Sequence, residues 1–335
     1  MILYIGNNIK SNTVSVTTLA NLSTLLKKEG YKIKTASSLK NQALRVSAML
    51  WAIIKYRKRI NHVLIDTYST RNFYYAFASS QLCRLLHLKY IPILHGGNLP
   101  NRLEKSPKLC KLIFKNAYKN IAPSQYLQSE FNARSYKTVF IPNVLEIDKY
   151  NCLERKFESP KLLYVRAFAK IYNPEMAIKT LHVLKQRYPK ALLCMIGPEK
   201  DGTFQSCKAL VKSLRLENDV EFTGMLSKAE WHKKAEDFNI FINTTNIDNT
   251  PMSVMEAMAL GLPIVSTNVG GMPYLINDRV NGLLVEKNNV DAMVNAIIEI
   301  CENEFLTKTL VVNARQKVEQ FDWQKVKLLW QKVLQ

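Results

Sequence analysis

The feature that most constrains the fold is an alternation of short apolar runs with longer amphipathic segments along nearly the whole chain. The apolar runs of the first half are Ile2–Ile5, Tyr31–Thr35, His62–Ile65 and Tyr90–Leu94. A helix-like segment at residues 16–28 separates the first two runs. This alternation is the pattern of βαβ units, in which helices cover both faces of a mostly parallel sheet. We therefore expect a doubly wound α/β domain.

The same pattern begins again after a polar stretch that ends at Pro160. Its apolar runs are Lys161–Val165, Ala191–Ile196, Val220–Phe222, Ile240–Ile242 and Pro263–Ser266. A chain of 335 residues is long enough for two such domains. We expect the first at 1–153 and the second at 154–318, with a cleft between the carboxyl ends of their strands, where ligands of open α/β sheets bind.

Charge is distributed unevenly between the halves. Residues 1–150 contain 23 Lys and Arg against 6 Asp and Glu, whereas residues 151–335 contain 24 against 21. The basic half is expected to meet an anionic partner, such as lipid headgroups, a charged acceptor or nucleic acid. A well-solvated basic surface without a partner is the alternative.

One basic segment resembles a surface helix that rests on anionic lipid. Lys108, Lys111, Lys115 and Lys119 are spaced by three, four and four residues, which would align them on one helix face. The alternative is an ordinary core-packed helix with a solvated lysine face. The longest nearly apolar run, 46–54, is too short to span a bilayer, so no transmembrane segment is expected.

The sequence offers no metal site. Its six cysteines are widely spaced and form no Cys-x-x-Cys pair, which is typical of reduced core residues in a cytosolic protein. No Asp-x-Asp occurs, which argues against a carboxylate-bound metal for phosphate groups. We therefore expect no metal and no cofactor.

Residues 240–271 contain the most informative motif. The segment reads as a strand, a polar loop, a short helix from about Ser253 to Leu260, a second strand and a Gly-Gly turn. Amides at the start of that helix would suit a diphosphate, and Glu256 could accept hydrogen bonds from a pair of ribose hydroxyls. The spacing of Ser253 and Glu256 equally fits a capping box that only closes the helix start.

This segment resembles the signature of glycosyltransferase family 4, a retaining group with the GT-B fold. Asp248 and Glu256 occupy its Glu-x7-Glu positions, followed by Ala-Met-Ala-Leu-Gly-Leu-Pro-Ile and Gly-Gly. Three further segments resemble the family in order: Ile141–Asn143, Val220–Gly224 and Phe321–Trp323. The resemblance implies two Rossmann-like domains facing across a cleft, with a C-terminal helix at 319–335 that returns to the first domain.

The resemblance also implies roles for residues of the second domain. Glu256 would hold the ribose of a donor nucleotide, and Asp248 would face the transferred sugar. The amides of Met252, Ser253 and Val254 would approach the phosphate and the sugar. Asp248 is one methylene shorter than the glutamate of the family, which puts its direct reach to the sugar in question.

Cations and a histidine complete the implied site. Arg166 and Lys170 would neutralise the leaving diphosphate in place of a metal, and a solvated surface lysine is the alternative for Lys170. His95 leaves a strand into Gly-Gly, where the family places a His-Gly loop against the sugar. The catalytic roles thus fall to Asp248, Arg166 and His95. Ser11 and Asn12 replace the Gly-Gly of the family in the first loop.

The resemblance predicts a metal-independent hexosyltransferase that moves a sugar from a nucleotide-diphosphate donor to a saccharide or lipid-linked acceptor, in bacterial surface polysaccharide or glycolipid synthesis. The expected location is the cytoplasm, with the inner face of the cytoplasmic membrane as a docking surface. A nucleotide-sugar epimerase of the same fold is one alternative. A basic nucleic-acid or membrane-binding protein without catalysis is another, but no nucleic-acid-binding motif is found, so no nucleic-acid partner is expected.

Overall fold

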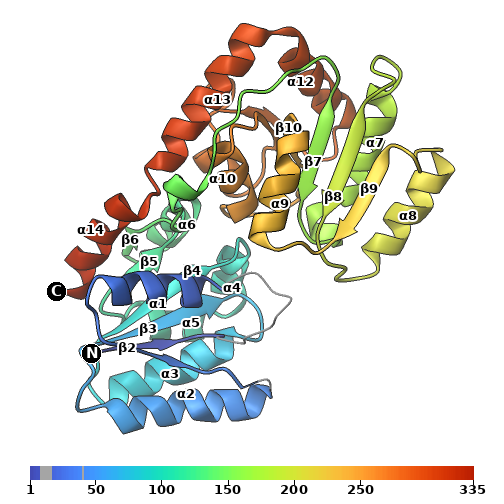
Figure 1. The fold of residues 1–335 in the computed structure, drawn as a ribbon. Coiled ribbons are helices and arrows are strands. Elements are labelled where there is room, and N and C mark those ends of the chain that lie inside the picture. Colours follow the sequence, from blue (N-terminus) through green and yellow to red (C-terminus); the bar gives the residue numbers. More distant parts are fainter. Residues whose placement is uncertain (8–16, 40) are drawn as a thin grey trace. The chain divides into compact units, whose positions relative to one another are not determined.

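The computed structural model describes residues 1–7, 17–39 and 41–335. The chain forms two compact units (Figure 1). Unit 1 contains Met1–Val144 and Trp323–Gln335, and unit 2 contains Leu145–Asp322. The first division lies nine residues before the boundary expected after residue 153, and the second lies four residues after the one expected at residue 318. Residues 145–153 belong to unit 2 because Arg315 donates a hydrogen bond to the Tyr150 carbonyl and the Leu153 amide donates to the Leu260 carbonyl.

Unit 1 is a six-stranded parallel sheet with helices on both faces. Its strands are β1 (Ile2–Ile5), β2 (Ile33–Ala36), β3 (His62–Tyr68), β4 (Tyr90–His95), β5 (Asn120–Ala122) and β6 (Thr138–Phe140). Its helices are α1 (Thr18–Lys28), α2 (Gln42–Tyr56), α3 (Phe73–Leu85), α4 (Leu99–Lys105), α5 (Pro107–Phe114), α6 (Gln125–Ala133) and α14 (Trp323–Leu334). The strand order β2-β1-β3-β4-β5-β6 reverses direction between β1 and β3. That point is where doubly wound sheets bind ligands.

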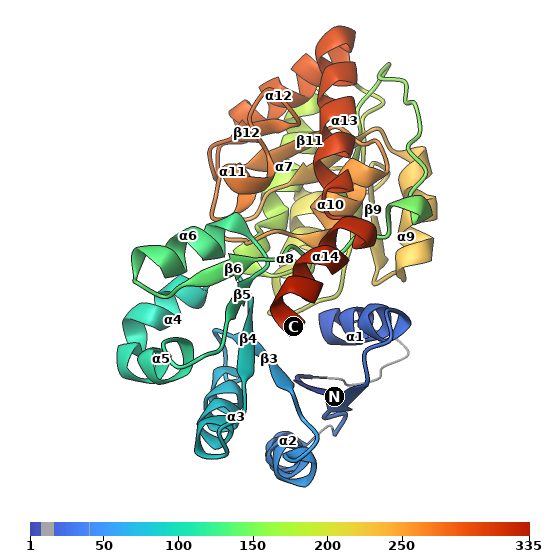
Figure 2. The same ribbon diagram turned by 90° about the vertical axis from the view of Figure 1, so that its left-hand side faces the viewer.

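Two apolar layers enclose this sheet. Leu3 and Ile5 of β1 point to the layer formed with α2, α3 and α5, while Ile2 and Tyr4 point to the layer formed with α1 and α14. The C-terminal helix α14 therefore belongs to the core of the first unit, as expected (Figure 2). The indole of Trp323 also donates a hydrogen bond to Glu29 Oε1, at 3.0 Å.

Unit 2 repeats this architecture. Its strands are β7 (Lys161–Val165), β8 (Leu192–Ile196), β9 (Val220–Gly224), β10 (Ile240–Asn243), β11 (Ile264–Thr267) and β12 (Leu283–Val285). Its α-helices are α7 (Pro174–Leu184), α8 (Thr203–Ser213), α9 (Lys228–Lys234), α10 (Met252–Ala259), α11 (Met272–Leu275), α12 (Val290–Glu302) and α13 (Glu304–Glu319). Three 3₁₀ turns complete it: η1 (Ile147–Lys149), η2 (Lys170–Tyr172) and η3 (Ala235–Asp237). The parallel order β12-β11-β10-β7-β8-β9 reverses between β7 and β10.

The two doubly wound parallel sheets confirm the α/β fold expected from the sequence. All nine predicted strands are present, with ends shifted by at most a few residues. The prediction missed β5, β6 and β12, which have only three residues each and carry too short a pattern to recognise. Four cysteines are buried, as expected, but Cys152 is exposed.

Candidate active site

Arg166 and Asp248 meet at the switch point of unit 2. Arg166 directly follows β7, and Asp248 lies in the loop that leads from β10 to α10. The guanidinium of Arg166 forms an ion pair with the carboxylate of Asp248. Their side chains are 21% and 12% exposed, so both are partly shielded from solvent and still reachable by a ligand. The ring of Tyr172 lies 4.6 Å from the guanidinium carbon of Arg166, which is cation–π distance.

Hydrogen bonds between the loops after β7 and β10 fix this pair. The Asn246 amide donates to the Ile171 carbonyl at 2.8 Å, and the Thr244 hydroxyl donates to the Tyr172 carbonyl at 3.0 Å. The Thr245 hydroxyl adds a bond of 3.2 Å to the Ile171 carbonyl. These bonds tie the loop after β10 to carbonyl groups of the loop after β7. The relative positions of Arg166 and Asp248 are therefore fixed.

The Gly-Gly turn after β11 supports the Asp248 loop from another direction. The Gly271 amide donates to the Asp248 carbonyl at 3.0 Å. A Cβ atom on Gly270 would lie closer than 3.0 Å to the Asp248 carbonyl oxygen, and one on Gly271 would lie equally close to the Asn249 carbonyl oxygen. Only glycine permits this approach of backbone to backbone. This close packing explains why the family motif has two glycines at this turn.

Helix α10 presents free amides at its start. It begins at Met252, one residue before the expected start, and Pro251 is the N-cap residue, with no side-chain cap. The first internal amide donor is Met255, which donates to the Pro251 carbonyl at 3.2 Å. Amides of the first helical turn have no partner within the helix, so those of Met252, Ser253 and Val254 can serve an anionic ligand.

Glu256 is a buried carboxylate with three partners, and the capping-box interpretation is wrong. A capping box needs the acidic residue three positions after the N-cap residue, but Glu256 lies five positions after Pro251. The side chain of Glu256 contacts residues outside the helix instead. Lys228 forms an ion pair with Oε1, and the Tyr150 hydroxyl donates to the same oxygen at 3.3 Å. His232 Nε2 lies 3.6 Å from Oε2. Glu256 is 3% exposed, whereas the Lys228 side chain is 44% exposed.

These partners keep Glu256 ionised. Burial alone would raise the pKa of the carboxyl group, but the neighbouring His232 and the charge and hydrogen bond of Lys228 outweigh burial and lower it. A carboxylate has about four lone-pair positions, so Glu256 retains capacity for further donors such as ribose hydroxyls.

Lys170 is separate from this cluster. It opens the 3₁₀ turn η2 in the same loop as Arg166, but its side chain is exposed. Its main-chain amide donates to Asp201 Oδ2 at 3.0 Å. The geometry agrees with the alternative of a solvated lysine that was left open in the sequence.

His95 lies in unit 1, at the carboxyl end of β4. Its Nε2 atom is 2.9 Å from Oδ1 of Asp66, which belongs to β3. The Tyr4 hydroxyl donates to the same oxygen at 2.9 Å. Ser11 and Asn12, which replace the Gly-Gly of the family in the first loop, lie outside the described residues.

The sequence did not single out several partners of these residues: Asp66 and Tyr4 beside His95, Tyr172 beside Arg166, and Tyr150, Lys228 and His232 around Glu256. Asp66 carried a usable signal, since it follows the apolar run at 62–65 and parallel strands end at a common edge. The partners of Glu256 carried none, because Lys228 and Tyr150 are separated from it by 28 and 106 residues.

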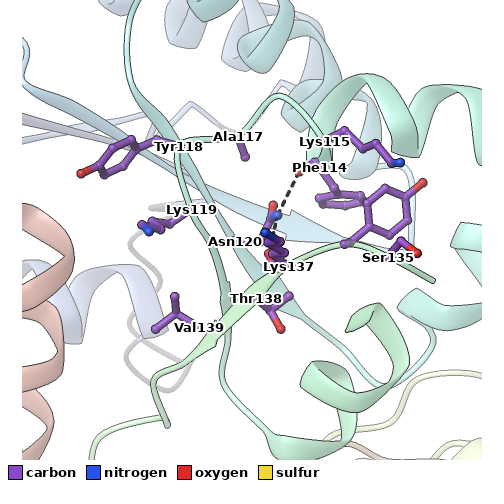
Figure 3. A pocket seen from close by; sticks show the side chains of 11 residues that line it. Phe114, Lys115, Ala117, Tyr118, Lys119, Asn120, Ser135, Lys137, Thr138 and Val139 are labelled. Carbon is purple, nitrogen blue, oxygen red and sulfur yellow. Dashed lines mark hydrogen bonds between the residues drawn. The ribbon is translucent and has the colours of Figure 1, made fainter. Parts of the chain in front are cut away.

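Unit 1 also contains an open pocket of about 330 Å³ at the amino ends of β5 and β6 (Figure 3). It is lined by Phe114, Lys115, Ala117, Tyr118, Lys119, Asn120, Ser135, Tyr136, Lys137, Thr138 and Val139. The pocket lies at the opposite ends of the strands from His95. No carboxylate among the described residues forms an ion pair with Lys115, Lys119 or Lys137. Asn120 is buried, and its Oδ1 has no hydrogen-bond partner.

The four lysines at 108, 111, 115 and 119 do not lie on one helix face. Helix α5 ends at Phe114, so Lys108 and Lys111 lie on it, Lys115 caps its end and Lys119 lies beyond it. The helix stops early because the Asn116 side chain bonds the Leu112 carbonyl and the Tyr118 amide bonds the Tyr90 carbonyl. Its apolar face, formed by Cys110, Ile113 and Phe114, is buried in unit 1. The helix is therefore core-packed with exposed lysines.

Metal-binding clusters and membrane-spanning helices are both absent from the described residues. No three His, Cys, Asp or Glu side chains lie together in an arrangement that could hold a metal ion. No helix in the same residues is long and apolar enough to cross a membrane.

Residues 152–317, which include Arg166, Asp248 and Glu256, match the sequence profile of the glycosyl transferases group 1. The chain belongs to this family. Among relatives of this group 1 glycosyltransferase, an uncharacterized glycosyltransferase of Haemophilus influenzae is 26% identical over 62% of this chain and 57% of its own length. The amylovoran biosynthesis glycosyltransferase AmsK of Erwinia amylovora is 26% identical over 70% of this chain and 61% of its own. The chain thus spans less than two thirds of the length of either relative.

Solved structures show the GT-B fold for this group 1 glycosyltransferase. HepE of Anabaena, in complex with UDP, superposes with a TM-score of 0.77 at 17% identity over 99% of both chains. Sucrose-phosphate synthase of Thermosynechococcus elongatus superposes with a TM-score of 0.82 at 16% identity, over 99% of this chain and 97% of the other. These likenesses concern the fold alone.

Proposed function

We propose that this group 1 glycosyltransferase is a retaining enzyme of family 4 that transfers a hexose from a nucleotide-diphosphate sugar to a saccharide or lipid-linked acceptor. The observation that carries the proposal is the Arg166–Asp248 pair at the switch point of unit 2, in the loops that lead to the free amides of α10. A diphosphate needs a cation and N–H donors, which Arg166 and the α10 amides supply. A sugar hydroxyl needs a hydrogen-bond acceptor, which Asp248 supplies.

Each residue has a distinct task in the proposed reaction. Glu256 accepts hydrogen bonds from the ribose, and Asp248 accepts hydrogen bonds from the transferred sugar. Arg166 and the amides of Met252, Ser253 and Val254 stabilise the charge on the diphosphate as its bond to the sugar breaks. The acceptor hydroxyl attacks the anomeric carbon on the face from which the diphosphate leaves, and its proton passes to the departing diphosphate oxygen, so the configuration is retained. Catalysis rests on orientation and charge stabilisation, so no strongly basic side chain is needed.

His95 is proposed to contact the transferred sugar, and Lys170 to add positive charge near the diphosphate without a fixed position. The exposed side chain of Lys170 supports the weaker role. A Lys170→Gln variant is therefore expected to bind donor nearly as well as the wild type, in contrast to an Arg166→Gln variant.

Binding of nucleotide sugars tests the proposal. A donor at 100 times its dissociation constant should stabilise the folded enzyme by about 2.7 kcal/mol, visible as a raised Tm. UDP-glucose is the first choice, because the HepE structure is also known with that ligand. Transfer to an acceptor is then followed by product analysis. Stabilisation by no nucleotide sugar would contradict the proposal, and epimerisation of the donor without an acceptor would favour the epimerase alternative.

We propose that transfer needs no metal, because Arg166 and the α10 amides can neutralise the leaving diphosphate. Turnover with a bound donor should therefore persist in excess chelator. Loss of turnover in chelator, restored only by magnesium or manganese, would contradict the role of Arg166. Replacing the chelator with an equal concentration of a non-chelating salt controls for ionic strength.

The proposed setting is polysaccharide or glycolipid synthesis on the cytoplasmic side of a bacterial membrane. The name of AmsK as an amylovoran biosynthesis enzyme supports this setting. The lysines of α5 and of the neighbouring pocket support an anionic membrane surface as a partner, because they are exposed and lack carboxylate neighbours among the described residues. The buried apolar face of α5 means that charge, rather than insertion of the helix, would provide the attraction.

A further inference from the structure

Asp66 is a buried carboxylate for which the proposed reaction has no task. It lies on β3 and is 1% exposed. An ionised carboxylate is costly to bury unless hydrogen bonds replace its water. Two groups do so here, since the Tyr4 hydroxyl donates to Oδ1 at 2.9 Å and His95 Nε2 lies 2.9 Å from the same atom.

The fold brings these three side chains together at a ligand-binding edge. Tyr4, Asp66 and His95 lie on β1, β3 and β4, which are neighbours in the sheet and flank its switch point. Gly6 follows β1, and a Cβ atom there would lie 2.5 Å from Asp66 Oδ2. The absence of a side chain at Gly6 therefore leaves space for the Asp66 carboxylate.

The contacts define the hydrogen positions of the imidazole. An ionised carboxylate only accepts hydrogen bonds, so Nε2 of His95 must carry the hydrogen that faces Asp66. Burial, and then the charge of Asp66, raise the pKa of Tyr4, which keeps its hydroxyl protonated as a second donor. In the neutral imidazole, Nδ1 then has a free lone pair. Within residues 1–7, 17–39 and 41–335, no hydrogen bond to Nδ1 is present.

Tyr68 fixes the plane of the ring. It is the register partner of His95 on β3, and the two rings stack with centroids 5.0 Å apart and planes inclined by 24°. Rotation of the imidazole about χ2 would break the bond to Asp66, and any rotation that tilts the ring would also break the stacking. His95 is itself 7% exposed, so little of the ring is free to move into solvent.

We propose that Asp66 is a positioning residue, which holds His95 in the Nε2–H tautomer so that Nδ1 accepts a hydrogen bond from a hydroxyl of the transferred sugar. This inference rests on the proposed function, because it gives His95 a sugar to contact. Tyr4 acts one step further away and holds Asp66 against rotation. The assignment concerns hydrogen-bond direction and not a proton transfer, so neither His95 nor Asp66 changes its protonation state during the reaction.

Nuclear magnetic resonance of the imidazole nitrogens tests the tautomer without any substrate. In the wild type, the neutral imidazole of His95 should show a protonated Nε2 and an unprotonated Nδ1. In an Asp66→Asn variant, the amide can donate to Nε2, and the tautomer should change to Nδ1–H. A wild-type protein with Nδ1–H would overturn the proposal, and this measurement does not depend on the folding of a variant.

Kinetics test the consequence for turnover. Asp66→Asn should lower kcat about 3- to 10-fold, the effect of one misdirected hydrogen bond, and change the KM for donor less than twofold. Combined with His95→Ala, it should cause no additional loss, because the histidine through which it acts is gone. An equal loss in both backgrounds would refute the positioning role. Absence of donor binding in the wild type would instead refute the proposed function and leave the tautomer result standing.

Discussion

Glu256 is the residue whose chemistry is best defined by its surroundings. Replacing it with glutamine keeps the size and removes a charge-assisted acceptor, so donor binding should weaken by about 1.5 to 3 kcal/mol, or roughly 10- to 100-fold in Kd. Calorimetric titration with the nucleotide sugar that stabilises the enzyme measures this change. The fold should be retained, since Tyr150 can still donate to the amide oxygen and the half-exposed Lys228 can reach solvent.

Asp248→Asn is the matched control for that titration. Asp248 is proposed to act on the transferred sugar, so its loss should lower kcat more than it weakens donor binding. A variant that binds donor as weakly as Glu256→Gln, with kcat unchanged, would contradict the separate tasks given to the two carboxylates.

The lowered pKa of Glu256 should make the free energy of unfolding depend on pH. Its pKa in the folded protein lies below the ordinary value of 4.5, so its ionised form stabilises the fold above that pH. This stabilisation is lost as the pH falls from about 4.5 through the lowered pKa. Urea unfolding of the wild type and of Glu256→Gln should therefore converge in acid. A difference in the free energy of unfolding that stays constant between pH 7 and pH 3 would contradict the ion pair with Lys228.

Residues of the candidate site were predictable from the sequence to different degrees. Resemblance and strand-end position together indicated Arg166, Asp248 and Glu256, and the structure brings the first two into contact. The pairing itself was not predicted, because a motif does not say which charges meet when no ligand is bound. The contact of Glu256 with Tyr150 depends on how the segment before β7 packs on α10, which no local pattern encodes.

At the scale of elements, the Gly-Gly turn offers a test of how the Asp248 loop is held. Gly271 has an ordinary negative φ of −83°, so alanine there adds only a steric clash with the Asn249 carbonyl. Gly271→Ala should destabilise the protein by about 1 to 3 kcal/mol in urea unfolding and weaken donor binding as the loop shifts. Gly202→Ala is the control, because Gly202 has a positive φ of 87° and open space around it. It should cost about 1 kcal/mol and leave donor binding unchanged.

Secondary structure was predictable where the pattern is long enough. Apolar runs identified the nine strands of four or more residues in the described part of the chain, whereas the three-residue strands were missed. Lysine spacing overestimated α5, because spacing alone does not show that the side chain of Asn116 bonds a carbonyl of the last turn. The strand order within each sheet was also beyond the sequence, since periodicity specifies which residues face the core and not which strand is the neighbour.

At the scale of the molecule, the charge follows the structural units more sharply than the sequence halves. Unit 1 contains 25 Lys and Arg against 4 Asp and Glu, and unit 2 contains 22 against 23. The C-terminal helix adds three lysines and no acid to unit 1. A field of one sign over a whole unit attracts anionic partners and weakens as salt increases.

This distribution leads to a prediction about membrane surfaces. Each basic side chain near an anionic surface contributes on the order of 1 kcal/mol at modest salt, so the exposed Lys108, Lys111, Lys115 and Lys119 should give weak, reversible binding. Sedimentation with vesicles that contain anionic lipid should recover the wild type at low salt and release it as salt rises. Changing these four lysines to glutamine should reduce the sedimented fraction.

A matched variant separates the position of the charge from its amount. Four exposed lysines of unit 2 can be changed to glutamine instead: Lys190, Lys200, Lys212 and Lys287. This control removes the same net charge from the unit that carries no excess, so it should sediment like the wild type. Equal losses in both variants would mean that net charge alone drives binding. Equal sedimentation with neutral and anionic vesicles would refute the docking surface and make a soluble acceptor the better expectation, because nothing else among the described residues favours a lipid-borne one.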